Sequence, residues 1–136
     1  MPSHRFTVLE GSWAVARLSP LAPLPAWAFS TAAFTTVTRS DDELSIVCPE
    51  KCVPAGTQVE AGWSVIKLLG PFPPTASGVL ASFLFPLAAV GISIFAVSTF
   101  ETNFILVRPT DLPKACDVLV RSGHKLESRI PAQKST

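Results

Sequence analysis

The side chains that could do chemistry in this chain are few and lie far apart. Asp41, Asp42 and Glu43 are consecutive, and Cys48 and Cys52 have the spacing of half a zinc site. A metal site would need further ligands nearby, and no second cysteine pair follows. No Ser/His/Asp set, phosphate loop or dinucleotide fingerprint is present either. The sequence therefore predicts no enzyme, no metal site and no cofactor.

The remaining reactive side chains are expected to be structural. The acidic run at 41–43 is typical of a solvated hairpin turn. Cys116 lies on a predicted helix, and His124 directly follows Gly123 at the end of that helix, without a partner nearby in sequence. Three further aromatic side chains fall in predicted strands or helices, which favours the core or an interface: Trp13, Trp27 and Trp63.

Composition limits the class of protein. The chain has 136 residues, 48% of them apolar and 15% charged, with a formal charge of +1, so it can bury one sizeable core or two small ones. The absence of a basic cluster argues against nucleic acid and against a polybasic membrane surface. Three cysteines and no apolar run of signal-peptide length at the start predict reduced thiols and a cytoplasmic protein.

One apolar window has the length of a membrane span. No charged residue occurs between Lys67 and Glu101, and the window at 79–97 is long enough to cross a bilayer. Pro86 and Gly91 interrupt it, and the residues beyond Gly91 are β-branched and aromatic, as in a strand. We therefore predict a helix followed by a buried strand, and no membrane segment.

That helix has recognisable ends. Thr75 and Ser77 are both candidate N-caps, Gly91 is suited to the C′ position, and Pro86 should kink the last turn or end it early. Its apolar stripe comprises Leu80, Phe83, Leu84, Leu87 and Ala88.

The rest of the chain reads as short strands around two further helical segments. A second long helix is predicted over 112–122, capped by Asp111, with Leu112, Ala115, Leu119 and Val120 facing inward. A short helix is predicted over 25–29, and a single helical turn after Cys48. The predicted strands cover residues 13–18, 34–39, 44–48, 57–60, 63–69, 92–98, 104–108 and 124–130, and residues 6–9 are a further candidate strand.

The two predicted hairpins match in sequence at a shift of sixty residues. In this alignment Val37 corresponds to Val97 and Asp41 to Glu101. The strands before them match at a shift of fifty, where Trp13 corresponds to Trp63. Each copy then reads strand, helix, strand, strand, helix, strand. The predicted fold is α+β, with two tandem ferredoxin-like (βαββαβ) units, the first with shortened helices. The predicted domains are residues 1–61 and 62–130, followed by a polar tail at 131–136.

Parts of this pattern resemble a known family. The residues from Gly78 to Ala81 and from Leu87 to Ile94 are similar to the core motif of ACT domains. The segments 98–107 and 41–49 resemble the two hairpins of the tandem-ACT group that includes the CASTOR arginine sensors and short, stand-alone bacterial ACT proteins. The resemblance covers the chain from about Trp13 to Leu126.

The resemblance implies a small regulatory protein that binds a free amino acid, or a similar small ligand, at the junction between ACT units. A regulated partner protein is implied but not identified, and a homodimer is left open. The implied ligand-binding residues come from a helix start and a hairpin turn: Thr75, Ser77, Gly78, Val79, Thr99, Phe100, Glu101 and Asn103.

Asn103 stands where this group often has aspartate, and asparagine cannot neutralise a cationic ligand, which disfavours an arginine-like ligand. We expect one site per chain, built mostly from the second copy. The alternative is a ligand-free structural or protein-interaction module, in which a sheet edge or an exposed Phe100 contacts another chain.

Overall fold

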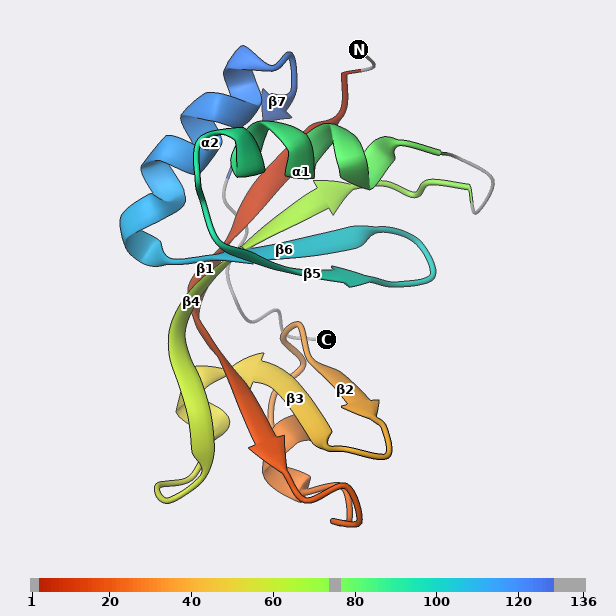
Figure 1. Cartoon of the computed structure of the whole chain (residues 1–136), viewed down its shortest axis with the longest axis vertical. Helices are drawn as coiled ribbons and strands as arrows, with labels where there is room; N and C mark the ends of the chain where they lie inside the picture. The colour runs from red at the N-terminus through yellow and green to blue at the C-terminus, as the bar shows by residue number, and fades with distance from the viewer. Residues whose placement is uncertain (1–2, 74–76, 129–136) are drawn as a thin grey trace. The chain divides into compact units, whose positions relative to one another are not determined.

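A computed structural model describes residues 3–73 and 77–128 of the chain, drawn in colour in Figure 1. The described residues form two compact units. Unit 1 consists of residues 3–9 and 64–128, and unit 2 of residues 10–63. Strands β1 (Arg5–Leu18) and β4 (Gln58–Leu69) run through both units. The α+β class predicted from the sequence is confirmed.

Unit 2 is a four-stranded sheet with two single-turn 3-10 helices. Its strand order is β2-β3-β1-β4, with β2 at Thr36–Arg39 and β3 at Leu44–Pro49. The short helices are η1 (Ala26–Phe29) and η2 (Glu50–Cys52), so the helices of this copy are shortened as predicted. Its core contains Ala16, Ala28, Leu44, Ile46 and Cys48.

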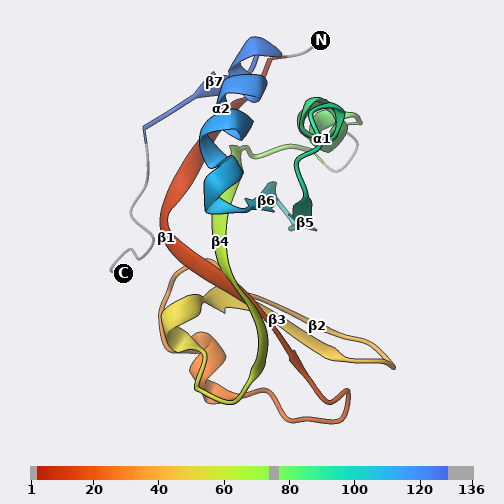
Figure 2. The ribbon, with the colours of Figure 1, turned by 60° about the vertical axis from the view of Figure 1, so that its left-hand side comes forward.

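Unit 1 has two full helices on one face of its sheet (Figures 1 and 2). The strand order is β7-β1-β4-β6-β5. Its remaining elements are α1 (Val79–Ala89), β5 (Ile94–Ser98), β6 (Asn103–Val107), η3 (Pro109–Asp111), α2 (Leu112–Arg121) and β7 (Lys125–Leu126). The core packs Phe83 and Leu87 of α1 and Ala115 and Leu119 of α2 against alternate residues of the sheet: Phe6, Val8, Ile66, Leu68, Ile105 and Val107.

The start of the chain belongs to unit 1. Arg5 and Phe6 pair in parallel with Lys125 and Leu126 of β7, and the Phe6 and Val8 side chains are buried in the unit 1 core. Residues more than a hundred positions apart in sequence are therefore neighbours in one sheet. The domain division after residue 61 stays a prediction.

The hairpin turns show which residue of the β2–β3 hairpin corresponds to which residue of the β5–β6 hairpin. The Ser40 N–H donates to the Glu43 carbonyl at 2.9 Å, and the Thr99 N–H donates to the Thr102 carbonyl at 2.9 Å. The flanking pairs are Arg39 with Leu44 and Ser98 with Asn103, so the hairpins correspond at a shift of 59 residues, from 39 to 98. The predicted shift of sixty is wrong by one residue.

This difference reverses which residues face the core. At the observed shift Ile46 corresponds to Ile105 and Cys48 to Val107, and all four are buried. A one-residue slip would exchange the two faces of the strand. Because β6 has several apolar residues in succession, its sequence pattern fits either alignment, and the correct one could not be chosen from the sequence. The shift of fifty for the preceding strands agrees with the pairing: Arg17 pairs with Ser45 and Lys67 with Phe104.

The start of α1 differs from the prediction. The helix begins at Val79 and its N-cap is Gly78, with φ +79°, so Ser77 is not the N-cap, and no side chain within the described ranges caps the first turn. Thr75 lies outside the described residues. Pro86 is accommodated within the helix, which continues to Ala89. Of the predicted inward residues, Ala88 of α1 and Val120 of α2 are exposed.

Both predicted glycine helix ends are confirmed. Gly91 has φ +77°, and its N–H donates to Ala88 at 3.0 Å while the Ile92 N–H donates to Leu87 at 3.1 Å. These are the two bonds of a Schellman motif. Gly123 ends α2 in the same way. Asp111 occupies the N-cap position of α2 as predicted, but its side chain makes no capping bond. Within the described ranges, no helix is both long and apolar enough to cross a membrane.

Candidate ligand-binding site

The β5–β6 turn, residues 99–102, is held firmly against the end of β4. The Thr102 hydroxyl donates to the Leu68 carbonyl at 2.6 Å, and the Phe72 N–H donates to the Glu101 carbonyl at 2.9 Å. Gly70 permits this approach, because a Cβ there would lie 2.9 Å from the Glu101 oxygen. The turn is therefore a fixed platform for side chains on both of its sides.

On one side, the turn and the start of α1 enclose a pocket of about 290 Å³, which we call the helix-end pocket. Its lining residues are Phe72, Pro73, Gly78, Val79, Leu80, Ala81 and the segment 98–103. The first amides of a helix have no partner within the helix, and among the described residues no side chain caps them. The space at the Gly78 Cα is open, with nothing within 4 Å of a Cβ built there.

Most of the predicted ligand-binding residues meet at this pocket. Gly78 and Val79 line it from the helix, and the turn contributes Thr99, Phe100, Glu101 and Asn103. The Ser98 hydroxyl donates to the Asn103 Oδ1 at 2.6 Å, which links the two ends of the turn. Ser77 is exposed and does not line the pocket. The predicted helix start and hairpin turn are thus brought together within unit 1.

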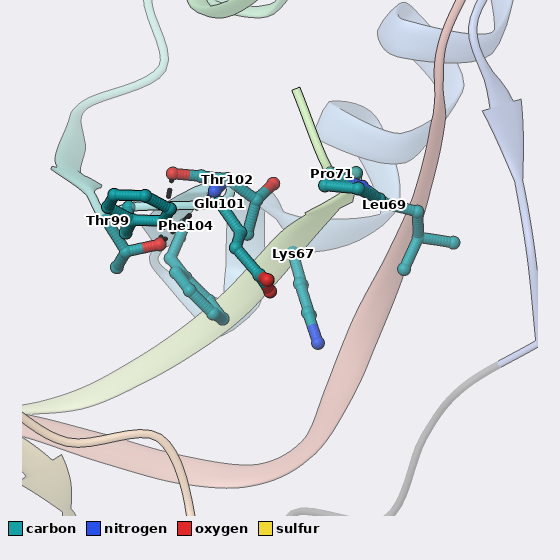
Figure 3. A pocket seen from close by; sticks show the side chains of 9 residues that line it. Lys67, Leu69, Pro71, Thr99, Glu101, Thr102 and Phe104 are labelled. Carbon is teal, nitrogen blue, oxygen red and sulfur yellow. Dashed lines mark hydrogen bonds between the residues drawn. The ribbon is translucent and has the colours of Figure 1, made fainter. Parts of the chain in front are cut away.

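On the other side of the turn lies a larger hollow of about 510 Å³, which we call the lysine groove (Figure 3). Its lining residues are Lys67, Leu69, Gly70, Pro71, Phe104 and the turn 99–102. The Lys67 ammonium lies 5.9 Å from the centroid of the Phe104 ring. Figure 3 shows the Lys67 and Glu101 side chains extending to the same side of the groove.

Sequence reasoning missed the lysine groove. A signal was present, because Lys67 is a charged residue between the core residues Ile66 and Leu68 of an apolar strand. Strand alternation places such a residue on the face opposite the core. Its neighbour on that face, Phe104, could be identified only from the observed pairing of β4 with β6.

His124 is buried and fully engaged in the fold. Its Nδ1 accepts from the His4 N–H at 3.2 Å, its Nε2 lies 3.0 Å from the Ser82 carbonyl, and its ring stacks on Phe83 at 3.9 Å. A carbonyl can only accept, so Nε2 donates to Ser82 while Nδ1 accepts from His4. Burial, and secondarily the neighbouring His124, lowers the pKa of His4. These contacts give His124 a structural role.

The cysteines and the acidic run do not form a reactive site. Cys48 is fully buried, and burial together with the nearby Cys52 raises its pKa to about 11. Asp41 and Asp42 are exposed in the β2–β3 turn. In the part of the chain that the structure describes, no three metal-binding side chains converge.

The chain is similar throughout its length to a protein of Agrobacterium tumefaciens of known crystal structure. The two share 41% identity over 99% of this chain and 100% of the other, with a TM-score of 0.90. A family model for the ACT domain matches residues 58–121, and a separate model, described as an N-terminal domain, matches residues 11–56. This chain belongs to the family of the Agrobacterium protein and contains an ACT domain.

More distant structures share the fold of this ACT protein. A Vibrio cholerae protein of unknown function, described as a possible transport protein, has 20% identity and a TM-score of 0.71, covering 89% of this chain and 91% of its own. The regulatory subunit of aspartate kinase from Thermus thermophilus, in a ligand-free form, has 10% identity and a TM-score of 0.60, with 82% and 91% covered. No curated protein matches the chain. The ACT resemblance is confirmed for 58–121, while membership of the CASTOR-like tandem group stays a prediction.

Proposed function

We propose that this chain is a small regulatory protein whose unit 1 binds a free amino acid in the helix-end pocket. The observation that carries this proposal is that the first turn of α1, which no described side chain caps, lines the same pocket as the polar β5–β6 turn. The proposal assigns the chain no reaction. Its regulated partner protein and its cytoplasmic location belong to the same proposal, which leaves the assembly state open.

The pocket has complementary groups for both charges of a free amino acid. The first amides of α1, at Val79, Leu80 and Ala81, together with the positive end of the helix dipole, suit a carboxylate. The Glu101 carboxylate can neutralise an ammonium group there once its side chain turns from the lysine groove, where Figure 3 shows it, toward the helix-end pocket. The side chain of the ligand would contact the apolar residues of the lining, Phe72, Pro73 and Phe100. A neutral or apolar amino acid therefore fits better than a basic one.

The first test is thermal unfolding of the full chain in the presence of each of the twenty amino acids. A ligand at a hundred times its dissociation constant should stabilise the protein by about 2.7 kcal/mol. We expect one or a few neutral amino acids to raise the melting temperature. If none of the twenty does so at millimolar concentration, the proposal is wrong.

Ala81 offers a variant that separates loss of binding from loss of folding. It is exposed, it lines the pocket and it lies in the first turn of α1. Ala81→Asp should stabilise the helix through its dipole by about 0.3–1 kcal/mol while repelling a ligand carboxylate. Ala81→Asn has nearly the same shape without the charge and should keep binding. Gly78 is a poor choice for this test, because φ +79° strains any side chain placed there.

Glu101 has a matched control in unit 2. At the observed hairpin correspondence its counterpart is Asp42, which is also exposed in a four-residue turn. Glu101→Gln should weaken amino-acid binding by about tenfold or more, because a charge-assisted hydrogen bond is lost. Asp42→Asn should leave binding unchanged. Equal effects of the two substitutions would place the site elsewhere.

The alternative function is a ligand-free interaction module, and one observation favours it. Phe100 is 91% exposed at the tip of the turn, next to the edge strand β5. If this ring contacts a second copy, sedimentation should show a dimer that Phe100→Ser dissociates. A monomer at all concentrations, together with amino-acid binding, would rule this alternative out.

A further inference from the structure

We propose that the lysine groove is a second binding site, for a small aromatic monocarboxylate, independent of the helix-end pocket. The two hollows share residues 99–102 of the β5–β6 turn, but the groove contains Lys67, which lies on the sheet face away from the core, whereas the helix-end pocket contains the start of α1, which packs on the core face. Their other residues differ, so their chemistry differs. At about 510 Å³, the groove has the size of an ordinary small-molecule site.

The anion-binding group is Lys67, and comparison with unit 2 shows that it is not needed to hold the turn. The corresponding cation of unit 2, Arg17, donates to the carbonyl of Asp42 in the β2–β3 turn at 2.9 Å. In unit 1 the turn is held instead by the Thr102 hydroxyl on Leu68. Lys67 therefore directs its ammonium over the groove rather than to the turn.

The groove also has an aromatic and apolar lining. The Phe104 ring lies beneath the Lys67 ammonium, and Leu69 and Pro71 border the opposite side. Phe100, exposed over 91% of its surface, is an aromatic ring available at the rim. Aromatic rings pack on one another in offset or edge-to-face geometry, which adds to the area they bury. A ligand ring can occupy this surface while its carboxylate reaches Lys67.

Glu101 limits the charge of the ligand. Its side chain extends to the same side of the groove as Lys67 (Figure 3). One cation and one carboxylate leave the groove with little net charge, so a ligand with two or three negative charges would be repelled. This favours monocarboxylates over dicarboxylates and phosphate esters.

The test uses the full chain and three probes that share a phenyl ring and carry one, no or two negative charges: phenylacetate, phenylacetamide and phenylmalonate. Binding is followed by amide chemical shifts in a titration. We expect phenylacetate to shift the amides of Lys67, Leu69 and Phe104, and to bind about tenfold or more tighter than the amide or the dianion. Equal binding of phenylacetate and phenylacetamide, or no binding of phenylacetate at millimolar concentration, would overturn the proposal.

Variants separate the groove from the helix-end pocket. Lys67→Met keeps the apolar stem and should weaken phenylacetate at least about tenfold, whereas Lys67→Arg should retain it. Glu101→Gln should tighten phenylacetate, which is the opposite of its expected effect on a free amino acid. Ala81→Asp should leave phenylacetate unaffected. If Lys67→Met binds phenylacetate like the unmodified protein, or if Ala81→Asp abolishes that binding, the groove is not the site.

Discussion

Cys48 and His4 are two side chains of the described residues whose protonation the fold alters. Cys48 is fully buried in unit 2, and its pKa is raised to about 11. The pKa of His4 is lowered, first by burial and then by His124. The larger cause of each shift is loss of contact with water, which disfavours the charged form, and a neighbouring titratable group, His124 or Cys52, adds to it. Each therefore links the stability of the protein to pH, in a direction that the sign of the shift determines.

The Cys48 thiol should be unreactive in the folded protein. Iodoacetamide at pH 8 should modify the partly exposed Cys52 and Cys116 first, because the thiolate is the nucleophile and Cys48 forms little of it. Peptide mass spectrometry gives the three rates separately. Urea should bring the Cys48 rate up to that of the others. Modification of native Cys48 as fast as Cys116 would contradict this.

The same shift predicts an alkaline limit of stability. The folded pKa of Cys48 lies above its ordinary value of 9.0, so the unfolded chain loses the proton first as pH rises. The free energy of unfolding should therefore fall as pH increases from about 9 toward 11. Cys48→Ala should flatten this part of the profile relative to Cys116→Ala, in urea unfolding at each pH. An identical slope in the two variants would be the contrary result.

The lowered pKa of His4 predicts that the protein loses stability in acid. Because its folded pKa is lowered from 6.5, the unfolded chain takes up a proton first as pH falls. The free energy of unfolding should therefore decrease as pH drops below about 6.5. His4→Gln should reduce this slope, while substitution of the exposed Ser3 by Ala should not. The measurement is urea unfolding between pH 7.5 and 5.

At the scale of elements, the contact between β4 and the β5–β6 turn positions both proposed sites. It depends on a glycine that is needed for space rather than for its backbone angle. A Cβ at Gly70 would lie 2.9 Å from the Glu101 oxygen and 3.0 Å from the Phe72 nitrogen, which are the two atoms of one hydrogen bond. The turn cannot keep its position if that space is filled.

Gly70→Ala should therefore destabilise the protein by about 1–3 kcal/mol and impair both sites together. Denaturant unfolding measures the first effect, and amino-acid and phenylacetate titrations measure the second. The core of unit 1 should persist, with the amide shifts of α2 unchanged. Full binding at both sites in this variant would show that the turn is not held as described.

At the scale of the whole molecule, the first strand ties the start of the chain to unit 1. Beyond the pairing of β1 with β7, the Lys125 N–H donates to the His4 carbonyl at 2.9 Å and the Glu127 N–H to the Phe6 carbonyl at 2.8 Å. Phe6 and Val8 are part of the same core as α1 and α2. The core of unit 1 is therefore completed by residues 3–9, which are far in sequence from the rest of the unit.

Removing residues 1–9 should strongly destabilise unit 1. Burial of Phe6 and Val8 contributes about 1.5–3 kcal/mol each, which together is a large share of the stability of an ordinary domain. We expect poor amide dispersion in the truncated chain, and partial recovery on adding a peptide of residues 3–9. Arg5→Ala, an exposed substitution, should have little effect. A truncated chain as stable as the full one would contradict this role.

Local patterns in the sequence were enough for most of the elements, although the strand predicted at 13–18 begins at Arg5 and the two predicted at 57–60 and 63–69 form the single strand β4. The order of strands and helices, the glycine ends of both long helices and the position of the β5–β6 turn depend on residue types within a few positions. The same holds for the family motif. Glu101 and the start of α1 were recognised because each has its own short signal.

Only the tertiary structure decided the hairpin correspondence, the place of Arg5–Leu9 and the lysine groove. The correspondence depends on one turn hydrogen bond, which neighbouring apolar residues such as Ile105 and Leu106 do not reveal. The pairing of Phe6 with Leu126, and the placing of Lys67 over Phe104, depend on strands distant in sequence. Side-chain types specify which residues are buried, whereas hydrogen bonds between distant strands specify which residues become neighbours.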